Sequence, residues 1–411
     1  MRKPTNWLIS LVMLISSCVQ QKNSVLTAFD VYCEMVANDA KPMALHYPME
    51  SVEIDKLWME FGKVAKKHKV QLYREDDFPV SSLFPASLTE GKTVVMIHRG
   101  NTLEQYKQWK ADLRAADATN IQESEALARR FGRLMGYGSQ GINELLRKSS
   151  DFRDLASFGV KQQVTHLYYG DLDEAVNFYG KVLGLTAVDS ATFQISADAY
   201  LELHAFNSEH GEGQSKSTAV AFLTDQLPDW YAYVQKENVP IKYTYKPREG
   251  GPHDGFVAID PGGYLLEFEE FKQHPENELF MAALSQAPRM ETSVEGLNFY
   301  GSITWTYHKD LLMIQKFYEE ILGYQLVADQ GWTKIYQTSE TGFIGLVDER
   351  RGMENYADTK AVEIEWKISD EEGFDTYAQE FLLQYNYSNS SLMGPEKYRY
   401  HVKGINTKPN N

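Results

Sequence analysis

The chain has very little cysteine, with only Cys18 and Cys33 among its 411 residues. If Cys18 is modified, as argued below, Cys33 has no partner for an internal disulfide, so oxidising conditions would not stabilise the fold. Residues 29–36 have the pattern of a helix, and no paired base lies near Cys33 in the sequence. We therefore interpret Cys33 as a small buried hydrophobic residue and not as a nucleophile.

Positive charge is also scarce, since the chain has 41 lysines and arginines and 57 aspartates and glutamates, giving a net charge of −16. This balance argues against nucleic-acid binding, which needs a basic face to neutralise phosphates. The hydrophobic content of 43% with 13% aromatic residues is ample for packed cores. A chain of this length is expected to form two or three domains.

Long hydrophobic runs are missing too, because the apolar run at 8–15 is too short to span a bilayer. It follows Arg2 and Lys3 and leads to Leu14-Ile15-Ser16-Ser17-Cys18, which resembles a bacterial lipoprotein signal. The resemblance implies that residues 1–17 are a signal peptide and that Cys18 is lipidated. The chain would then sit at the cell envelope, on the periplasmic side of the outer membrane. The alternative is an ordinary secretory signal in which Cys18 is incidental.

Replacing Cys18 with serine should therefore release the protein from membranes, because the lipid would be its anchor. Fractionating cells that express the wild type or Cys18→Ser checks this expectation. Unchanged membrane association of the variant would refute the lipid anchor.

Residues 24–160 carry no motif of known chemistry. Their hydrophobic pattern predicts strands at 43–47, 70–74 and 93–98 and helices at 52–67, 103–115 and 121–135. This indicates a small α+β domain with a helical tail. His46 and His98 fall on two of the strands, and we assign no role to either.

The rest of the chain contains a repeat. Residues 164–184 and 303–323 align without a gap, and eight of the 21 positions are identical. The identical pairs are Thr165/Thr304, Tyr168/Tyr307, Asp171/Asp310, Leu172/Leu311, Phe178/Phe317, Tyr179/Tyr318, Leu183/Leu322 and Gly184/Gly323. The spacing is too long for a solenoid repeat and fits a duplicated domain.

Each copy begins with a predicted strand, a helix capped by an aspartate and ended by a glycine, and three further strands. Residues 218–271 repeat this β-α-β-β-β order within the first copy, and 260–263 (Asp-Pro-Gly-Gly) predicts a hairpin turn. The first copy therefore consists of two βαβββ modules, and the fold class is α+β.

At this point the chain resembles the vicinal oxygen chelate superfamily, which includes glyoxalase I, bleomycin-resistance proteins and ring-cleaving dioxygenases. The segments that carry the resemblance are 165–167, 171–184, 201–203 and 260–267. The resemblance implies a first domain at 161–272, a linker at 273–300 and a degenerate second domain at 301–411. A tandem pair of this kind could remain monomeric.

In that superfamily, paired modules form a cup that holds a divalent metal, with ligands on the first and last strands of each module. The resemblance implies that His166, Glu202 and Glu267 are ligands and that Ala219 occupies the fourth position. Because alternate residues of a strand share a face, His204 lies beside Glu202 and could replace the missing ligand. Such a set suits Zn, Ni, Mn or Fe(II).

In the second copy Trp305 and Gly345 stand at ligand positions, so we expect no metal there. Its aromatic residues could stack on a ligand or pack in a core (Trp305, Tyr307, Trp332, Tyr336 and Trp366). The loop 248–254 could form a lip over the cup.

The resemblance implies a metal-dependent isomerase, epimerase or lyase acting on a small oxygenated molecule, with Glu202 or Glu267 as the base. The alternative is a non-catalytic small-molecule-binding protein, similar to bleomycin-resistance proteins. The sequence leaves both open.

Overall fold

The computed structural model describes residues 24–84, 90–117, 121–148 and 153–405, and it divides the chain into two compact units, 1–152 and 153–411. Residues 1–17 and Cys18, to which we assigned the signal peptide and lipid, lie outside the described residues. Within the described ranges, no helix combines the length and apolar character needed to cross a membrane.

The N-terminal unit is a three-stranded antiparallel sheet covered by helices on both faces. Its strands run in the order β1 (Met43–Leu45), β3 (Val94–His98), β2 (Gln71–Glu75). The helices are 24–37, α2 (Ser51–His68), α4 (Thr102–Ala115), α5 (Ile121–Leu134) and α6 (Ser139–Leu146). The predicted α+β fold of this region is therefore confirmed, but residues 153–160, which we placed in it, belong to the larger unit. Cys33 is fully buried against α2, and burial raises the pKa of its thiol to about 12, as expected of an unreactive core residue.

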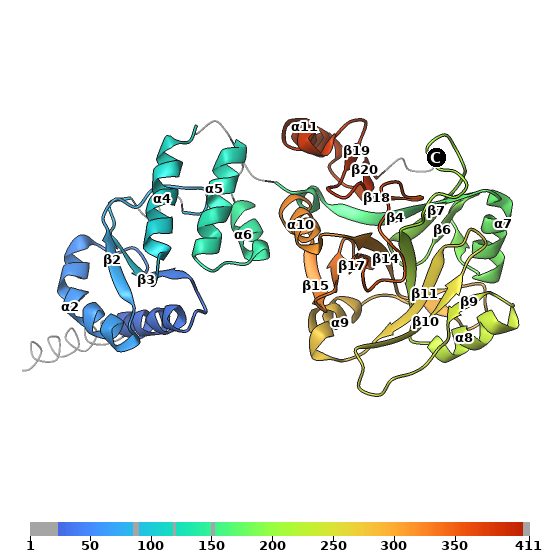
Figure 1. Ribbon diagram of the computed structural model, residues 1–411, viewed down its shortest axis with the longest axis horizontal. Coiled ribbons are helices and arrows are strands. Elements are labelled where there is room, and N and C mark those ends of the chain that lie inside the picture. The colour runs from blue at the N-terminus through green and yellow to red at the C-terminus, as the bar shows by residue number, and fades with distance from the viewer. Residues whose placement is uncertain (1–23, 85–89, 118–120, 149–152, 406–411) are drawn as a thin grey trace, which may run out of the picture. The chain divides into compact units, whose positions relative to one another are not determined.

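The larger unit contains four modules of one design (Figure 1), preceded by a short 3₁₀ turn, η1 (Leu155–Phe158). Module 1 comprises β4 (Val160–Tyr169), α7 (Leu172–Asn177) with a π-helical turn (Phe178–Val182), β5 (Thr186–Ala187), β6 (Thr192–Gln194) and β7 (Ala199–Ala205). Module 2 comprises β8 (Thr218–Leu223), α8 (Leu227–Lys236), β9 (Ile241–Tyr243), β10 (His253–Ile259) and β11 (Leu265–Phe271). The two-module reading of the first copy is confirmed.

The second copy follows the same order. Module 3 comprises β14 (Gly301–His308), α10 (Leu311–Lys316) with a π-helical turn (Phe317–Ile321), β15 (Gln325–Asp329), β16 (Thr333–Gln337) and β17 (Gly342–Asp348). Module 4 comprises β18 (Val362–Ile368), α11 (Glu371–Phe381), β19 (Ser391–Met393) and β20 (Arg399–Gly404), one strand fewer than the others. Between the copies lie η3 (Pro275–Asn277), α9 (Glu278–Leu284), β12 (Met290–Glu291) and β13 (Asn298–Phe299).

The modules do not pair in sequence order. A seven-stranded sheet joins modules 1 and 4 through antiparallel β4 and β18. An eight-stranded sheet joins modules 2 and 3 through antiparallel β8 and β14. Figure 1 shows β18 and β20 beside β4 and β7, with β14 beside the strands of module 2. The two copies therefore exchange modules, and each sheet contains one module from each copy.

The two sheets pack through one face each. At their contact the duplicated threonines meet, with 2.5 Å between the hydroxyl oxygens of Thr165 and Thr304. Apolar side chains of the strands pack with the helices in one large core that includes Leu167, Phe222, Ile344 and Ile364. The remaining face of each sheet is free to form a cup. We call these the first cup (modules 1 and 4) and the second cup (modules 2 and 3).

Two buried tyrosines tie the sheets together in equivalent ways. The Tyr264 hydroxyl accepts a hydrogen bond from Tyr168 N at 2.8 Å and donates to the Ala361 carbonyl at 2.6 Å. The Tyr398 hydroxyl accepts from Tyr307 N at 2.7 Å and donates to the Ser217 carbonyl at 2.6 Å.

Tyr264→Phe and Tyr398→Phe should each lower the free energy of unfolding by about 1–3 kcal/mol, because backbone groups of the first strands lose buried partners. Urea unfolding followed by tryptophan fluorescence measures this. Tyr243→Phe, at a tyrosine that is 49% exposed, serves as control. Equal midpoints for all three variants would show that these hydroxyls contribute nothing.

Candidate functional site

The strand register defines four equivalent positions in the four modules. In each module, the ligand position on the first strand lies five residues before the N-cap residue of the helix that follows (N-caps Asp171, Gln226, Asp310 and Asp370). Counting back gives His166, Ala221, Trp305 and Glu365. Their parallel neighbours on the last strands are Glu202, Glu267, Gly345 and His401, respectively.

The first cup therefore has four metal-ligand side chains at equivalent positions: His166, Glu202, Glu365 and His401. In the second cup only Glu267 is a side chain of that kind. The two cups are built from the same duplicated modules, yet they differ in the side chains at the ligand positions.

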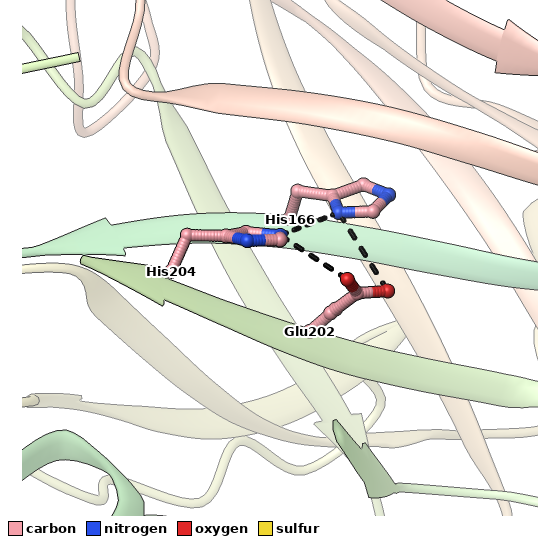
Figure 2. A group of neighbouring side chains, drawn as sticks. All are labelled: His166, Glu202 and His204. Carbon is pink, nitrogen blue, oxygen red and sulfur yellow. Dashed lines mark hydrogen bonds and ion pairs between the residues drawn. The ribbon is translucent and has the colours of Figure 1, made fainter. Parts of the chain in front are cut away.

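Module 1 supplies one half of the first cup (Figure 2). His166 from β4 faces Glu202 and His204 from β7, and ligand atoms of the three residues all lie within 4.8 Å of one another. His166 Nδ1 lies 2.8 Å from His204 Nε2 and 3.9 Å from a Glu202 oxygen. The prediction that His204 lies beside Glu202 on the same face is therefore confirmed.

Module 4 supplies the other half. Glu365 Oε2 lies 3.8 Å from His166 Nε2, and the rings of His166 and His401 are 5.9 Å apart between centroids. Lys403 Nζ is 2.5 Å from the same Glu365 oxygen. The Glu365 side chain is 2% exposed and needs this positive charge, because an unpaired buried carboxylate is costly.

A carboxylate behind His401 fixes the orientation of its ring. Glu363 accepts hydrogen bonds from His401 at 2.7 Å, from His210 at 3.2 Å and from the Tyr168 hydroxyl at 3.0 Å. Burial acts to raise the pKa of Glu363, but His401, His210 and the nearby Arg399 outweigh it and lower this pKa to about 2. Glu363 thus remains ionised, as in a carboxylate–histidine pair that supports a metal ligand.

In the first cup, the ligand atoms of His166, Glu202 and His204 converge closely enough for a divalent metal, while Glu365 lies near the other ring nitrogen of His166. Burial, together with His204 and His401, lowers the pKa of His166 well below its usual value, so its imidazole is neutral, as a ligand must be. His166 Nε2 is buried and has no hydrogen-bond partner within the described part of the chain. Two imidazoles and two carboxylates form a donor set suited to Zn, Ni, Mn or Fe(II).

The structure does not bring Glu267 to this site, so the expectation of one cup holding His166, Glu202 and Glu267 is wrong. Glu267 lies in the eight-stranded sheet because module 2 pairs with module 3 and not with module 1. The fourth position was also misassigned. Ala219 lies beside Leu265, whereas Ala221 lies beside Glu267.

Sequence reasoning missed Glu365 and His401, although a signal for them was present. The turn Gly394-Pro395-Glu396-Lys397-Tyr398 occupies the place of the turn 260–264, and Lys397 adopts the positive φ that Gly263 has in the other copy. Counting onward from each tyrosine by three residues gives Glu267 and His401. Counting back five residues from the Asp370 cap gives Glu365.

A cavity of about 450 Å³ adjoins the first cup at β19 and β20. It reaches His401 and Arg399, and its other lining is mostly amide and hydroxyl side chains (Asn386, Ser388, Asn389 and Ser391). Leu392 and Met393 complete the wall, so it offers a polar molecule both hydrogen bonds and apolar contact.

Comparison with known proteins agrees with the fold. Residues 161–268, which span modules 1 and 2, match the Glyoxalase/Bleomycin resistance protein/Dioxygenase superfamily, and this part of the chain belongs to that superfamily. The superfamily includes metal-dependent enzymes such as glyoxalase I. No curated protein matches the chain.

Among solved structures, the chain is similar to a candidate dioxygenase from Bacillus subtilis, at 18% identity and a TM-score of 0.40, covering 60% of this chain and 85% of the other. Glyoxalase I from Zea mays gives 15% identity and a TM-score of 0.38, covering 59% and 91%. An integron cassette protein from Vibrio cholerae gives 23% identity and a TM-score of 0.22, covering 28% and 94%.

Proposed function

We propose that the first cup is the active site of a divalent-metal-dependent isomerase, epimerase or lyase that acts on a small oxygenated molecule. The observation that carries the proposal is the register: His166, Glu202, Glu365 and His401 stand at the four equivalent ligand positions of one sheet. The unpartnered nitrogen of His166 supports it.

In this proposal His166, Glu202, Glu365 and His401 hold the ion, and Glu363 positions His401. A bound divalent ion would supply Lewis acidity to a substrate oxygen. The Glu202 side chain is 34% exposed, the most accessible of these carboxylates, so it can take a proton from a substrate carbon at one of its oxygens. The cavity lined by Asn386, Asn389 and Arg399 would bind the oxygen-bearing groups of the substrate.

Proton exchange tests this proposal. The purified full-length protein, loaded with Zn²⁺, Ni²⁺, Mn²⁺ or Fe²⁺, is incubated in D₂O with a panel of 2-hydroxy aldehydes, 2-hydroxy ketones and 2-oxo acids. NMR should show metal-dependent deuterium incorporation next to the carbonyl of at least one compound, and chelation should abolish it. One bound ion per chain without exchange would instead favour a binding protein. Absence of metal binding would refute the site itself.

A further inference from the structure

The second cup has lost the metal ligands and is rebuilt as an aromatic chamber. Trp305 occupies the ligand position of β14, and the neighbouring Gly345 makes room for it, since a Cβ at Gly345 would overlap the indole. Tyr307 packs on Gly352 in the same manner. The alanine at position 221 leaves Glu267 without a facing imidazole.

A cavity of about 210 Å³ lies over this surface. Its wall contains Glu267, Glu269, Trp305, Tyr307, Trp332 and Arg351, and it adjoins a wider cavity of about 650 Å³ that reaches the loop residues Arg248–Asp254 anticipated as a lip. The inner cavity is too small for a large ligand, but a small molecule of about ten heavy atoms fits it, with any longer part in the wider one.

Two buried polar atoms of this chamber make no hydrogen bond of good geometry, although Glu269 interacts with the neighbouring Glu267 and Trp305. Glu269 is 5% exposed and Trp305 is 6% exposed. Neither Oε2 of Glu269 nor Nε1 of Trp305 has a hydrogen-bond partner among the described residues. Burying such groups is costly unless a ligand satisfies them.

The two carboxyls lie two residues apart on β11 and therefore share a face. Burial raises the pKa of both groups, and the neighbouring Glu269 adds to the shift at Glu267. A ligand with positive charge would relieve this, because it stabilises the ionised form of each carboxyl. The aromatic faces favour a cation of the ammonium type.

One cationic side chain of the protein already lies over an aromatic ring of this chamber. The guanidinium of Arg351, at the rim, lies 5.0 Å from the centroid of the Trp332 ring. Mg²⁺ and Ca²⁺ fit less well, because they require six or more oxygen ligands, often including water, and this wall is largely aromatic. The wider cavity has mixed charge, since Lys246, Arg248, Asp254 and Glu276 all line it.

We propose that the second cup is a separate, metal-independent binding site for a small organic ammonium ion, held by Glu267 and Glu269 within the aromatic wall of Trp305, Tyr307 and Trp332. This inference does not depend on a metal in the first cup, so either proposal can fail without the other.

Choline and 3,3-dimethylbutan-1-ol test the proposal, because they have nearly the same shape and only choline is charged. Calorimetry and tryptophan quenching with the full-length protein should show choline binding at least about 10-fold more tightly than the neutral alcohol. Glu267→Gln/Glu269→Gln should remove at least about 10-fold of that affinity. Glu270→Gln, on the opposite face of the same strand, should leave it unchanged.

Three results would overturn the proposal. The neutral alcohol could bind as well as choline, which would make the chamber merely apolar. The double variant could retain full choline affinity, which would place the charge recognition elsewhere. Neither probe could bind at millimolar concentration, in which case the chamber accepts no ammonium ion. Circular dichroism of the double variant confirms that it remains folded.

Discussion

Replacing Glu365 or His401 with alanine should weaken divalent-metal binding by at least about 100-fold, beyond the 10–100-fold typical of residues outside the ligand shell. Both residues come from the second copy of the repeat, and the resemblance alone did not single them out. The same loss is expected for His166→Ala and Glu202→Ala. Titration of the metal-free protein with Zn²⁺, followed by competition with a chelator of known affinity, measures the effect.

Two further variants serve as controls for this titration. Glu267→Ala should leave Zn²⁺ affinity unchanged, because Glu267 lies in the other sheet. His204→Ala should cost no more than about 10-fold, because His204 stands at none of the four equivalent positions, although its ligand atom lies within 4.8 Å of those of His166 and Glu202. If His204→Ala abolishes binding and His401→Ala does not, the ion is held by module 1 alone and the register argument is wrong.

The wild type should become less stable as the pH rises from about 5 to about 8. The variant Glu269→Gln should lose less stability over the same range. Burial raises the pKa of Glu269 from 4.5 to about 8 in the folded protein. The unfolded chain then releases its proton at lower pH than the folded one, so unfolding becomes easier as the pH rises through this window. The glutamine stays neutral and removes this contribution.

The expected difference between wild type and Glu269→Gln is on the order of 1–4 kcal/mol over that window, since one pKa unit corresponds to about 1.4 kcal/mol. The groups that face the carboxyl pair are His253, Trp305, Tyr307 and, more distantly, Lys242. Thermal unfolding at pH 5, 6.5 and 8 measures the effect, with the exposed Glu340→Gln as control. Parallel pH profiles for all three proteins would contradict a buried, protonated Glu269.

Local features of the fold could be predicted from the sequence because short-range chemistry determines them. The Asp171 side chain accepts a hydrogen bond from Glu174 N, and Gly184 has a φ of +67°, as the cap and helix-end signals predicted. The strand and helix order of the modules followed from hydrophobic periodicity in the same way.

The pairing of modules could not be predicted, because it depends on which first strands meet. All four first strands contain β-branched and aromatic residues that suit any strand, and the charged residues of β18 do not by themselves identify β4 as its partner. The predicted register of module 2 was wrong for a different reason. Ala219 and Ala221 lie on the same face, so a shift by two residues leaves the hydrophobic alternation unchanged. Only the distance to the helix cap separates the two positions.

Anomalous diffraction from crystals of the full-length protein grown with Zn²⁺ tests the central claim most directly. Our account predicts one strong peak per chain in the first cup, with ligand atoms of His166, Glu202, Glu365 and His401 about 2.0–2.3 Å away. A peak beside Glu267 in the second cup, or no peak at all, would contradict it.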